Sequence, residues 1–250
     1  MKNSLLEICC YSVQSAINAE LAGADRIELC AGVHEGGTTP SAACIQLVKE
    51  LVKIPVFVII RPRGADFCYS DVEFECMLKD IEFCKTLGVD GIVSGVLLPD
   101  GEIDSIRTKQ LLNASGSMSF TFHRAFDMVK DHVKALDQLI ELGVDRILTS
   151  GGEQTAVKGC ETIKTLTEKA ADRLIIMPGS GILESNIQQL KNITRAKEFH
   201  CSSKVLVKGK MEYKNPKIAM GGEESVPEFE YFEADCNKIR KIVSILKAED

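Results

Sequence analysis

The phrase Gly-Ala-Asp-Arg-Ile at residues 23–27 returns as Gly-Val-Asp-Gly-Ile at residues 88–92 and as Gly-Val-Asp-Arg-Ile at residues 143–147. Each copy follows a helical apolar pattern and opens an apolar run, so each glycine is expected just past a helix end. Successive copies lie about two units of roughly 30 residues apart, and one such unit is the size of a strand with its crossover helix. This period predicts eight strand–helix units in 250 residues. The expected fold is an α/β single-domain (β/α)8 TIM barrel over residues 1–250.

Composition and charge indicate a chain with a large hydrophobic core and limit the kinds of partner that it is expected to bind. Hydrophobic residues make up 45% of the chain, which is enough for a large core. The 30 Lys and Arg residues are outnumbered by 36 Asp and Glu residues, giving a net charge of -6 without a basic block. Nucleic acids and anionic membranes attract clustered positive charge, so neither is expected as a partner.

The first residues of the chain and the pattern of cysteines bear on the cellular compartment of the protein. Residues 1–4 run directly into an apolar strand and show neither a secretory core nor a 20-residue apolar span. We therefore expect a cytosolic protein. The ten cysteines form no CxxC pair and have no regular spacing, so most are expected to be buried thiols in a reducing compartment.

The hydrophobic pattern predicts each strand and helix of the barrel. Strands are predicted at Leu5–Cys10, Asp25–Cys30, Val56–Ile60, Asp90–Val96, Met118–Phe122, Asp145–Thr149, Arg173–Met177 and Glu198–Ser202. Helices are predicted at Val13–Leu21, Ser41–Leu51, Asp71–Leu87, Ser105–Ala114, Val129–Leu142, Gly159–Ala171, Glu184–Leu190 and Ala234–Leu246. A long loop, residues 203–229, precedes the last helix and is expected to be functional or disordered.

Polar side chains gather where the predicted strands end. Residues two apart on a strand share a face, and charged groups do not easily face an apolar helix layer. We therefore place the following sets toward the barrel mouth: Glu7 with Cys9, Glu28 with Cys30, Arg61 with Arg63, Thr121 with His123, and Glu198 with His200 and Ser202. One interpretation is a salt-bridge network that only closes the barrel.

The other interpretation is a site for an anionic small molecule. Arginine forks match the geometry of carboxylate or phosphate, so Arg61 and Arg63 would act as an anion clamp. His123, with Glu28, would be the catalytic acid–base pair, and Glu7 is an alternative to Glu28. The Gly-Ser-Gly sequence at 179–181 offers backbone N–H groups where many barrels bind phosphate, although this signal is weak alone.

Two of the cysteines are candidates for a metal site. Cys9 and Cys30 end matching Glu-x-Cys sequences on neighbouring strands, whose axes lie about 4.8 Å apart. Two facing thiolates suit a soft ion such as Cu(I). Further candidate ligands are Cys10, His34, His123, His200 and Cys201.

These residues also lie in stretches that resemble the CutC family of copper homeostasis proteins. The resemblance runs in order over nearly the whole chain. It rests on residues 6–9 (LEIC), 23–30 (GADRIELC), 35–40 (EGGTTP), 60–64 (IRPRG), 121–127 (TFHRAFD), 148–151 (LTSG) and 198–200 (EFH).

The resemblance implies a TIM barrel, copper handling through Cu(I), and assembly into homo-oligomers, either dimer or tetramer. It implies a cytoplasmic location, with the nucleus as a second one. Cys9 and Cys30 match cysteine positions of the family's motifs, so they are the predicted metal ligands, with about one Cu(I) per subunit and no organic cofactor.

Holding Cu(I) does not by itself require the charged groups of the mouth, which resemble those of an enzyme. The predicted ligand-binding residues there are Glu7, Arg61, Arg63, Arg124, Asp127 and His200. Three hypotheses follow. The first is a cytosolic Cu(I)-binding protein, and the second is a barrel enzyme acting on a phosphorylated or carboxylated metabolite. The third is a scaffold whose oligomer surface is the functional part.

Overall fold

The repeated glycines lie just past helix ends, as the sequence predicts. In the computed structural model, which describes residues 4–215, 217–218 and 227–248, Gly23, Gly88 and Gly143 have φ angles of 88°, 64° and 86°. They follow the ends of α1 (Val13–Leu21), α3 (Asp71–Thr86) and α5 (His132–Leu142). Each copy of the repeat is therefore a helix-to-strand junction, as predicted.

The aspartate of each copy joins neighbouring strands at the amino-terminal end of the barrel. Its carboxylate accepts a hydrogen bond from a backbone N–H of the preceding strand in the barrel. The pairs are Leu6 N with Asp25 at 2.9 Å, Val56 N with Asp90 at 2.9 Å, and Phe120 N with Asp145 at 2.7 Å. In each of the three copies, the carboxylate thereby provides a hydrogen-bond acceptor for a backbone N–H group near the start of a strand.

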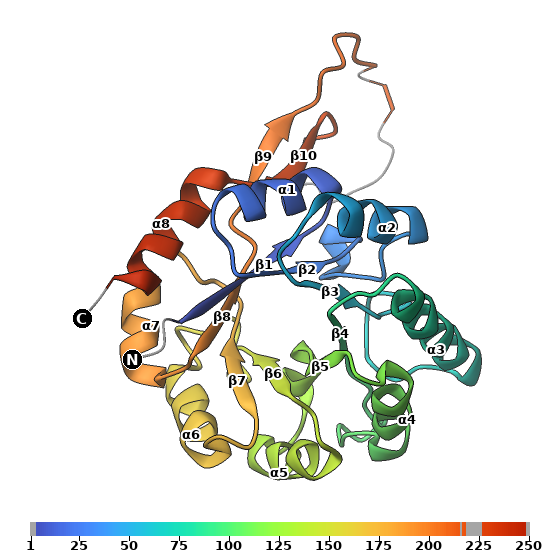
Figure 1. Ribbon diagram of the computed structural model, residues 1–250, viewed down its shortest axis with the longest axis vertical. Coiled ribbons are helices and arrows are strands. Elements are labelled where there is room, and N and C mark those ends of the chain that lie inside the picture. Colours follow the sequence, from blue (N-terminus) through green and yellow to red (C-terminus); the bar gives the residue numbers. More distant parts are fainter. Residues whose placement is uncertain (1–3, 216, 219–226, 249–250) are drawn as a thin grey trace.

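Eight parallel strands form the predicted (β/α)8 barrel (Figure 1). They are β1 (Leu5–Cys10), β2 (Arg26–Leu29), β3 (Val56–Ile59), β4 (Gly91–Ser94), β5 (Ser119–Phe122), β6 (Arg146–Thr149), β7 (Ile175–Pro178) and β8 (Glu198–Cys201). Each strand pairs with the next from β1 to β7, and β8 pairs with β1. β7 and β8 lie side by side at the seam.

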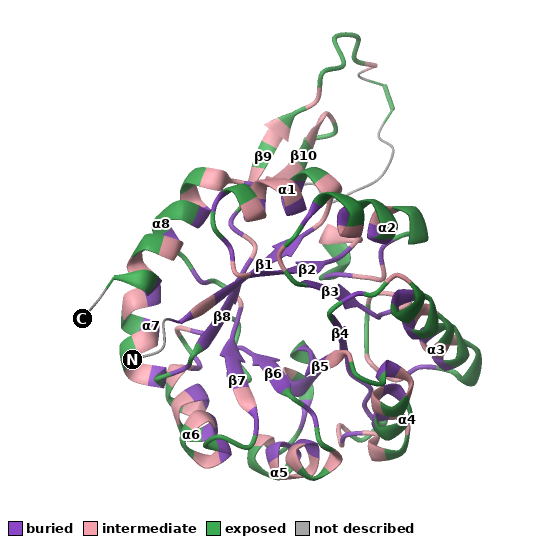
Figure 2. Cartoon of the chain, in the orientation of Figure 1, coloured by how far each residue is buried: buried purple, intermediate pink, exposed green. Residues whose placement is uncertain are grey.

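The helices surround the strands and bury one face against them. The remaining helices of the ring are α2 (Ala42–Leu51), α4 (Ser105–Ser115), α6 (Cys160–Ala170), α7 (Ile187–Thr194) and α8 (Cys236–Lys247). Figure 2 shows buried strands inside and exposed outer helix faces. Two short 3-10 turns, η1 (Val33–Glu35) and η2 (Arg124–Met128), follow β2 and β5. Within the described ranges, no helix has both the length and the apolar character that crossing a membrane requires.

One aromatic ring occupies the centre of the barrel. The guanidinium carbons of Arg26 and Arg146 lie 4.6 Å and 5.4 Å from the centre of the Phe57 ring. A Cβ atom on Gly91 would stand 2.6 Å from the same ring. Residues 26, 91 and 146 occupy the same position in the three copies of the repeat. The glycine of the second copy therefore makes room for Phe57.

The predicted long loop before the last helix is partly wrong. Its beginning forms β9 (Lys204–Lys208), which pairs as an antiparallel hairpin with β10 (Glu230–Ala234) directly after the predicted loop, and residues 216 and 219–226 of the loop lie outside the described residues. Ala234 N donates to Ser15 Oγ at 3.1 Å, and Asn18 Nδ2 donates to Ala234 O at 3.0 Å. The hairpin is thus attached to α1 and projects outside the helix ring (Figure 1).

Candidate functional site at the barrel mouth

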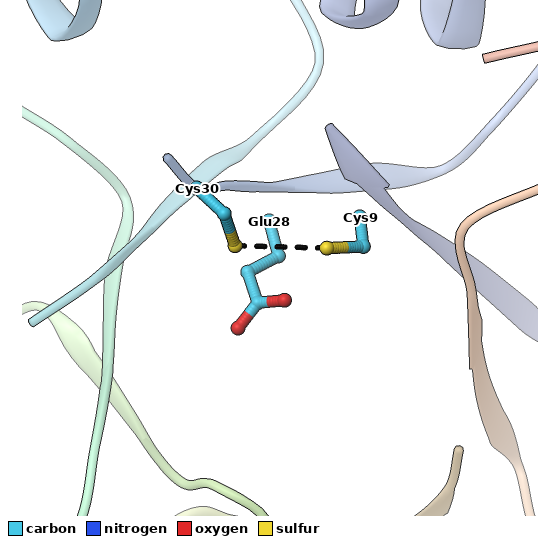
Figure 3. A group of neighbouring side chains, drawn as sticks. All are labelled: Cys9, Glu28 and Cys30. Atoms are coloured by element: carbon cyan, nitrogen blue, oxygen red, sulfur yellow. Dashed lines mark hydrogen bonds between the residues drawn. The ribbon is translucent and has the colours of Figure 1, made fainter. Parts of the chain in front are cut away.

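The two predicted cysteine ligands lie in contact. Cys9 is the fifth residue of β1 and is paired with Glu28, while Cys30 directly follows β2. Their Sγ atoms are 3.6 Å apart, and Figure 3 shows the two sulfur atoms facing each other beside Glu28. One ligand atom from each of the three residues lies within 4.8 Å of the others, and all three residues are buried. The possible ligand atoms of Cys9, Glu28 and Cys30 are therefore close enough together to coordinate one metal ion.

Strand alternation explains why only some cysteines reach this group. Cys9 and Cys30 belong to a small cluster inside the barrel, with Phe57, Ile59 and Val93. Cys10 belongs to the outer core between strands and helices, where its Sγ donates to Ile8 O at 3.5 Å. Cys201 belongs to the same outer core. Of these two predicted additional ligands, Cys10 does not line the cavity at the barrel mouth, whereas Cys201 lines the same cavity as Cys9.

The electrostatic environment shifts the pKa values of the two thiols in opposite directions. A hydrogen bond from Cys30 lowers the pKa of Cys9 well below its usual value, despite burial, and His200 adds to this effect. Burial and the neighbouring Cys9 raise the pKa of Cys30. The pKa of Glu28 is also raised, mainly by burial and by the charge of Cys9. These shifts favour the charged form of Cys9 and the neutral forms of Cys30 and Glu28.

His200 links this group to the centre of the barrel. Its Nδ1 lies 2.7 Å from Glu7 Oε1, and its Nε2 lies 3.6 Å from Glu28 Oε2. Burial opposes the charged form of His200, but Cys9 and the two carboxyl groups raise its pKa well above the ordinary value. Burial would likewise raise the pKa of Glu7, yet Arg26 and His200 lower it to about 2. His200 and Glu7 therefore form a buried ion pair.

Two arginines that the sequence analysis did not select complete a buried ion network. Arg26 pairs with Glu7 and also with Glu198 at 2.8 Å, and Arg146 pairs with Glu198 at 2.6 Å. The side chains of all four are at least 89% buried. The expected salt-bridge network is therefore present, but with Arg26 and Arg146 in place of Arg61 and Arg63. The signal was in the repeat, where arginine follows aspartate in two of three copies.

A cavity of about 490 Å³ opens above this network at the carboxyl ends of the strands. Eight residues that the sequence placed at the mouth or among the candidate ligands line it, namely Cys9, Glu28, Arg61, His123, Arg124, His200, Cys201 and Ser202. Cavities of this size hold small organic molecules. The cavity is therefore larger than a single metal ion needs.

The structure does not bring Arg61 and Arg63 together as a clamp. β3 ends at Ile59, so strand alternation no longer applies to either arginine. Arg61 is buried and donates to the carbonyl oxygens of Glu35, Gly37 and Ala65 at 2.6–2.9 Å. Arg63 is turned outward, where it pairs with Glu73 at 2.6 Å and Asp66 at 3.0 Å. Among these two, only Arg61 lines the cavity.

His123 and Glu28 do not form the predicted acid–base contact. No hydrogen bond or ion pair joins them in the described part of the chain, because the partner of Glu28 there is His200. His123 Nδ1 instead accepts a hydrogen bond from Ala125 N at 3.2 Å. Burial and the nearby charge of Arg61 lower the pKa of His123 to about 3, so its imidazole is neutral near pH 7.

Arg124 and Asp127 hold the loops after β5 and β6 together. Arg124 pairs with Asp127 at 2.7 Å and donates to Ser150 Oγ at 2.9 Å. Asp127 also accepts from Ser150 N at 3.0 Å and from Gly152 N at 3.1 Å. Asp127 therefore shapes the rim, whereas Arg124 lines the cavity itself.

Comparison with known proteins points to one family. A model of the CutC family matches residues 4–205. A copper homeostasis protein cutC homolog from Homo sapiens is 47% identical over 243 residues, covering 97% of this chain and 89% of that protein. A family protein CutC from Parabacteroides distasonis is 49% identical over 240 residues, covering 96% and 99%.

Solved structures agree with this result. The crystal structure of a copper homeostasis protein CutC from Streptococcus agalactiae matches with a TM-score of 0.76 at 35% identity, covering 80% of this chain and 98% of that chain. Phosphoribosylanthranilate isomerase from Thermotoga maritima matches with a TM-score of 0.59 at 11% identity, covering 98% of each chain. The second match concerns the barrel fold alone.

Proposed function

This chain belongs to the CutC family, and we propose that it acts in copper homeostasis by binding one Cu(I) ion per subunit between Cys9 and Cys30. The observation that carries the proposal is the 3.6 Å contact between the two Sγ atoms inside the barrel. Relatives at 47% and 46% identity are named copper homeostasis proteins. Copper is the cargo of such a protein rather than a resident cofactor.

The distance between the sulfur atoms suits a bent site. A metal–thiolate bond of about 2.3 Å separates two sulfurs by about 4.6 Å in a linear site and by about 4.0 Å at a trigonal angle. The observed 3.6 Å is closer to the trigonal value. The two side chains therefore need to move apart by only about half an ångström to hold an ion with a third ligand.

The chemistry of the donors favours Cu(I) over harder ions. Thiolates select soft metals, whereas carboxylates suit Mg²⁺, Ca²⁺ and Mn²⁺. Burial and the charge of Cys9 raise the pKa of Glu28, which favours its neutral form, and a protonated carboxyl group is a poor metal ligand. The two sulfurs are thus the principal ligands in this proposal.

The test is an anaerobic titration of the reduced protein with Cu(I) against a competing chelator. The wild-type protein is expected to take up one tight equivalent. The Cys9→Ser/Cys30→Ser double variant is expected to lose it, with an affinity at least 100-fold lower, because both soft ligands are gone.

The matched control is Cys10→Ala. Cys10 is adjacent to Cys9 on β1, but its thiol lies in the outer core and donates to Ile8 O. This variant is expected to bind Cu(I) like the wild type. Unchanged binding by the double variant, or loss of binding in Cys10→Ala alone, would refute the assignment of the ligands.

A further inference from the structure

Arg61 is a buried cation without a counter-ion. It is 6% exposed, and no carboxylate lies within ion-pair distance of it among the residues that the structure describes. The other buried arginines, Arg26 and Arg146, each pair with at least one glutamate. Burying a charge is strongly unfavourable unless an opposite charge compensates for it. The three carbonyl groups that bind Arg61 supply hydrogen bonds but no negative charge.

Unsatisfied donors mark the same place. In the described part of the chain, six buried side-chain polar atoms have no hydrogen-bond partner. Two of them, Arg61 Nε and His123 Nε2, belong to residues that line the cavity, and the other four belong to residues that do not. Buried polar atoms in native proteins are nearly always paired, so each exception requires an explanation.

The free nitrogen of His123 is a donor. His123 Nδ1 accepts from Ala125 N, so in the neutral imidazole the proton is on Nε2. Arg61 Nε is also a donor, because the guanidinium group has five N–H donors and no acceptor. The two residues are close enough for the charge of Arg61 to act on His123, and the Phe67 side chain lies against both. Two N–H donors and one uncompensated positive charge therefore belong to neighbouring residues of the cavity lining.

We propose that the barrel mouth binds a small organic carboxylate whose oxygen atoms accept hydrogen bonds from Arg61 Nε and His123 Nε2. A buried water molecule could satisfy the donors, but it would leave the charge of Arg61 uncompensated. A carboxylate supplies both the acceptor oxygens and a single negative charge.

The other walls of the cavity indicate the body of this ligand. The lining includes the apolar side chains of Val33, Ile59, Phe67 and Leu148, of which Phe67 lies against both Arg61 and His123. These side chains favour an aliphatic or aromatic group of a few carbon atoms rather than a second charge. Both nitrogens are shielded from solvent, and the centre of the Phe67 ring lies 5.0 Å from Arg61 Cζ and 5.0 Å from the centre of the His123 ring. This site is separate in its residues from the proposed Cu(I) ligands, and it does not depend on copper.

The test measures thermal unfolding of copper-free, reduced protein with isovalerate, benzoate, inorganic phosphate and isovaleramide at equal ionic strength. Isovaleramide has the shape of isovalerate but no charge. Isovalerate or benzoate is expected to raise Tm by about 3–5 °C at ten times its Kd, since a ligand that binds only the folded state stabilises it. Isovaleramide and phosphate are expected to have little effect.

Variants identify the site. Arg61→Gln removes the charge, and His123→Asn removes the Nε2 donor but keeps an acceptor for Ala125 N. Each is expected to weaken carboxylate binding at least tenfold, whereas Arg63→Gln is expected to bind like the wild type. If Arg61→Gln does not fold, the response of His123→Asn to the carboxylates alone tests the proposed site. The proposal is overturned if neither carboxylate protects the wild type, if phosphate or the amide protects equally, or if His123→Asn responds unchanged. None of these outcomes bears on Cu(I) binding by the cysteine pair.

Discussion

Single residues at the mouth differ sharply in their electrostatic state. Burial and Arg61 lower the pKa of His123, whereas Cys9 and neighbouring carboxyl groups raise the pKa of His200 although it is buried as well. The two imidazoles therefore have different chemistry: His123 offers a hydrogen bond, and His200 offers a positive charge beside a thiolate. A sequence pattern shows both histidines at strand ends but cannot show which groups surround them.

His123 gives a testable pH dependence. Its pKa of about 3 in the folded protein lies below the ordinary value of 6.5, so the unfolded chain binds more protons between these values. The stabilising contribution is complete above about pH 6.5 and is lost as the pH falls toward 3. Between about pH 6.5 and about pH 4 the loss is on the order of 3 kcal/mol.

The measurement is urea unfolding of the wild type and of His123→Asn at several pH values in this range. The difference in free energy of unfolding between the two proteins is expected to shrink as the pH falls, because only the wild type loses this contribution. A difference that stays constant from about pH 6.5 to about pH 4 would show that His123 titrates normally.

At the scale of the elements, one carboxylate joins three strands. Glu198 on β8 accepts hydrogen bonds from Arg26 on β2 and Arg146 on β6. Breaking a buried ion pair by removing one partner leaves an uncompensated charge in the interior and is strongly destabilising. Glu198 thus determines how β2, β6 and β8 are held across the barrel.

Glu198→Gln is expected to lower the free energy of unfolding by about 3 kcal/mol, since it leaves Arg146 without an acid. The control is Asp172→Asn, which breaks the exposed pair between Lys197 and Asp172, where the side chains are 77% and 93% exposed. Exposed pairs contribute little, so this change is expected to cost less than about 1 kcal/mol. Chemical denaturation compares the two variants, and equal costs would contradict a stabilising role for the network.

For the whole molecule, the repeated sequence was sufficient to predict the (β/α)8 barrel and its helix-to-strand junctions. The glycine and aspartate of residues 23–27, 88–92 and 143–147 recur because every second unit needs the same helix end and the same strand-edge acceptor. The Cys9–Cys30 contact was predicted from the matching Glu-x-Cys sequences on neighbouring strands, but the strand register pairs Cys9 with Glu28, so the two sequences are offset by two residues.

Other features depend on contacts that a linear pattern does not contain. Arg26 and Arg146 begin their strands, and only the closed barrel shows that both contact Phe57 and Glu198. The β9–β10 hairpin pairs segments that are distant along the chain. Arg61 and Arg63 diverge because β3 ends before them. The expected dimer or tetramer stays a prediction.

The central claim is that two sulfur atoms inside the barrel hold Cu(I), and copper K-edge X-ray absorption of the reduced protein with one equivalent of Cu(I) tests it most directly. The account predicts a first shell dominated by two sulfur atoms at about 2.3 Å, the distance typical of metal–thiolate bonds. A first shell made only of nitrogen or oxygen atoms, or an identical spectrum from Cys9→Ser/Cys30→Ser, would contradict it.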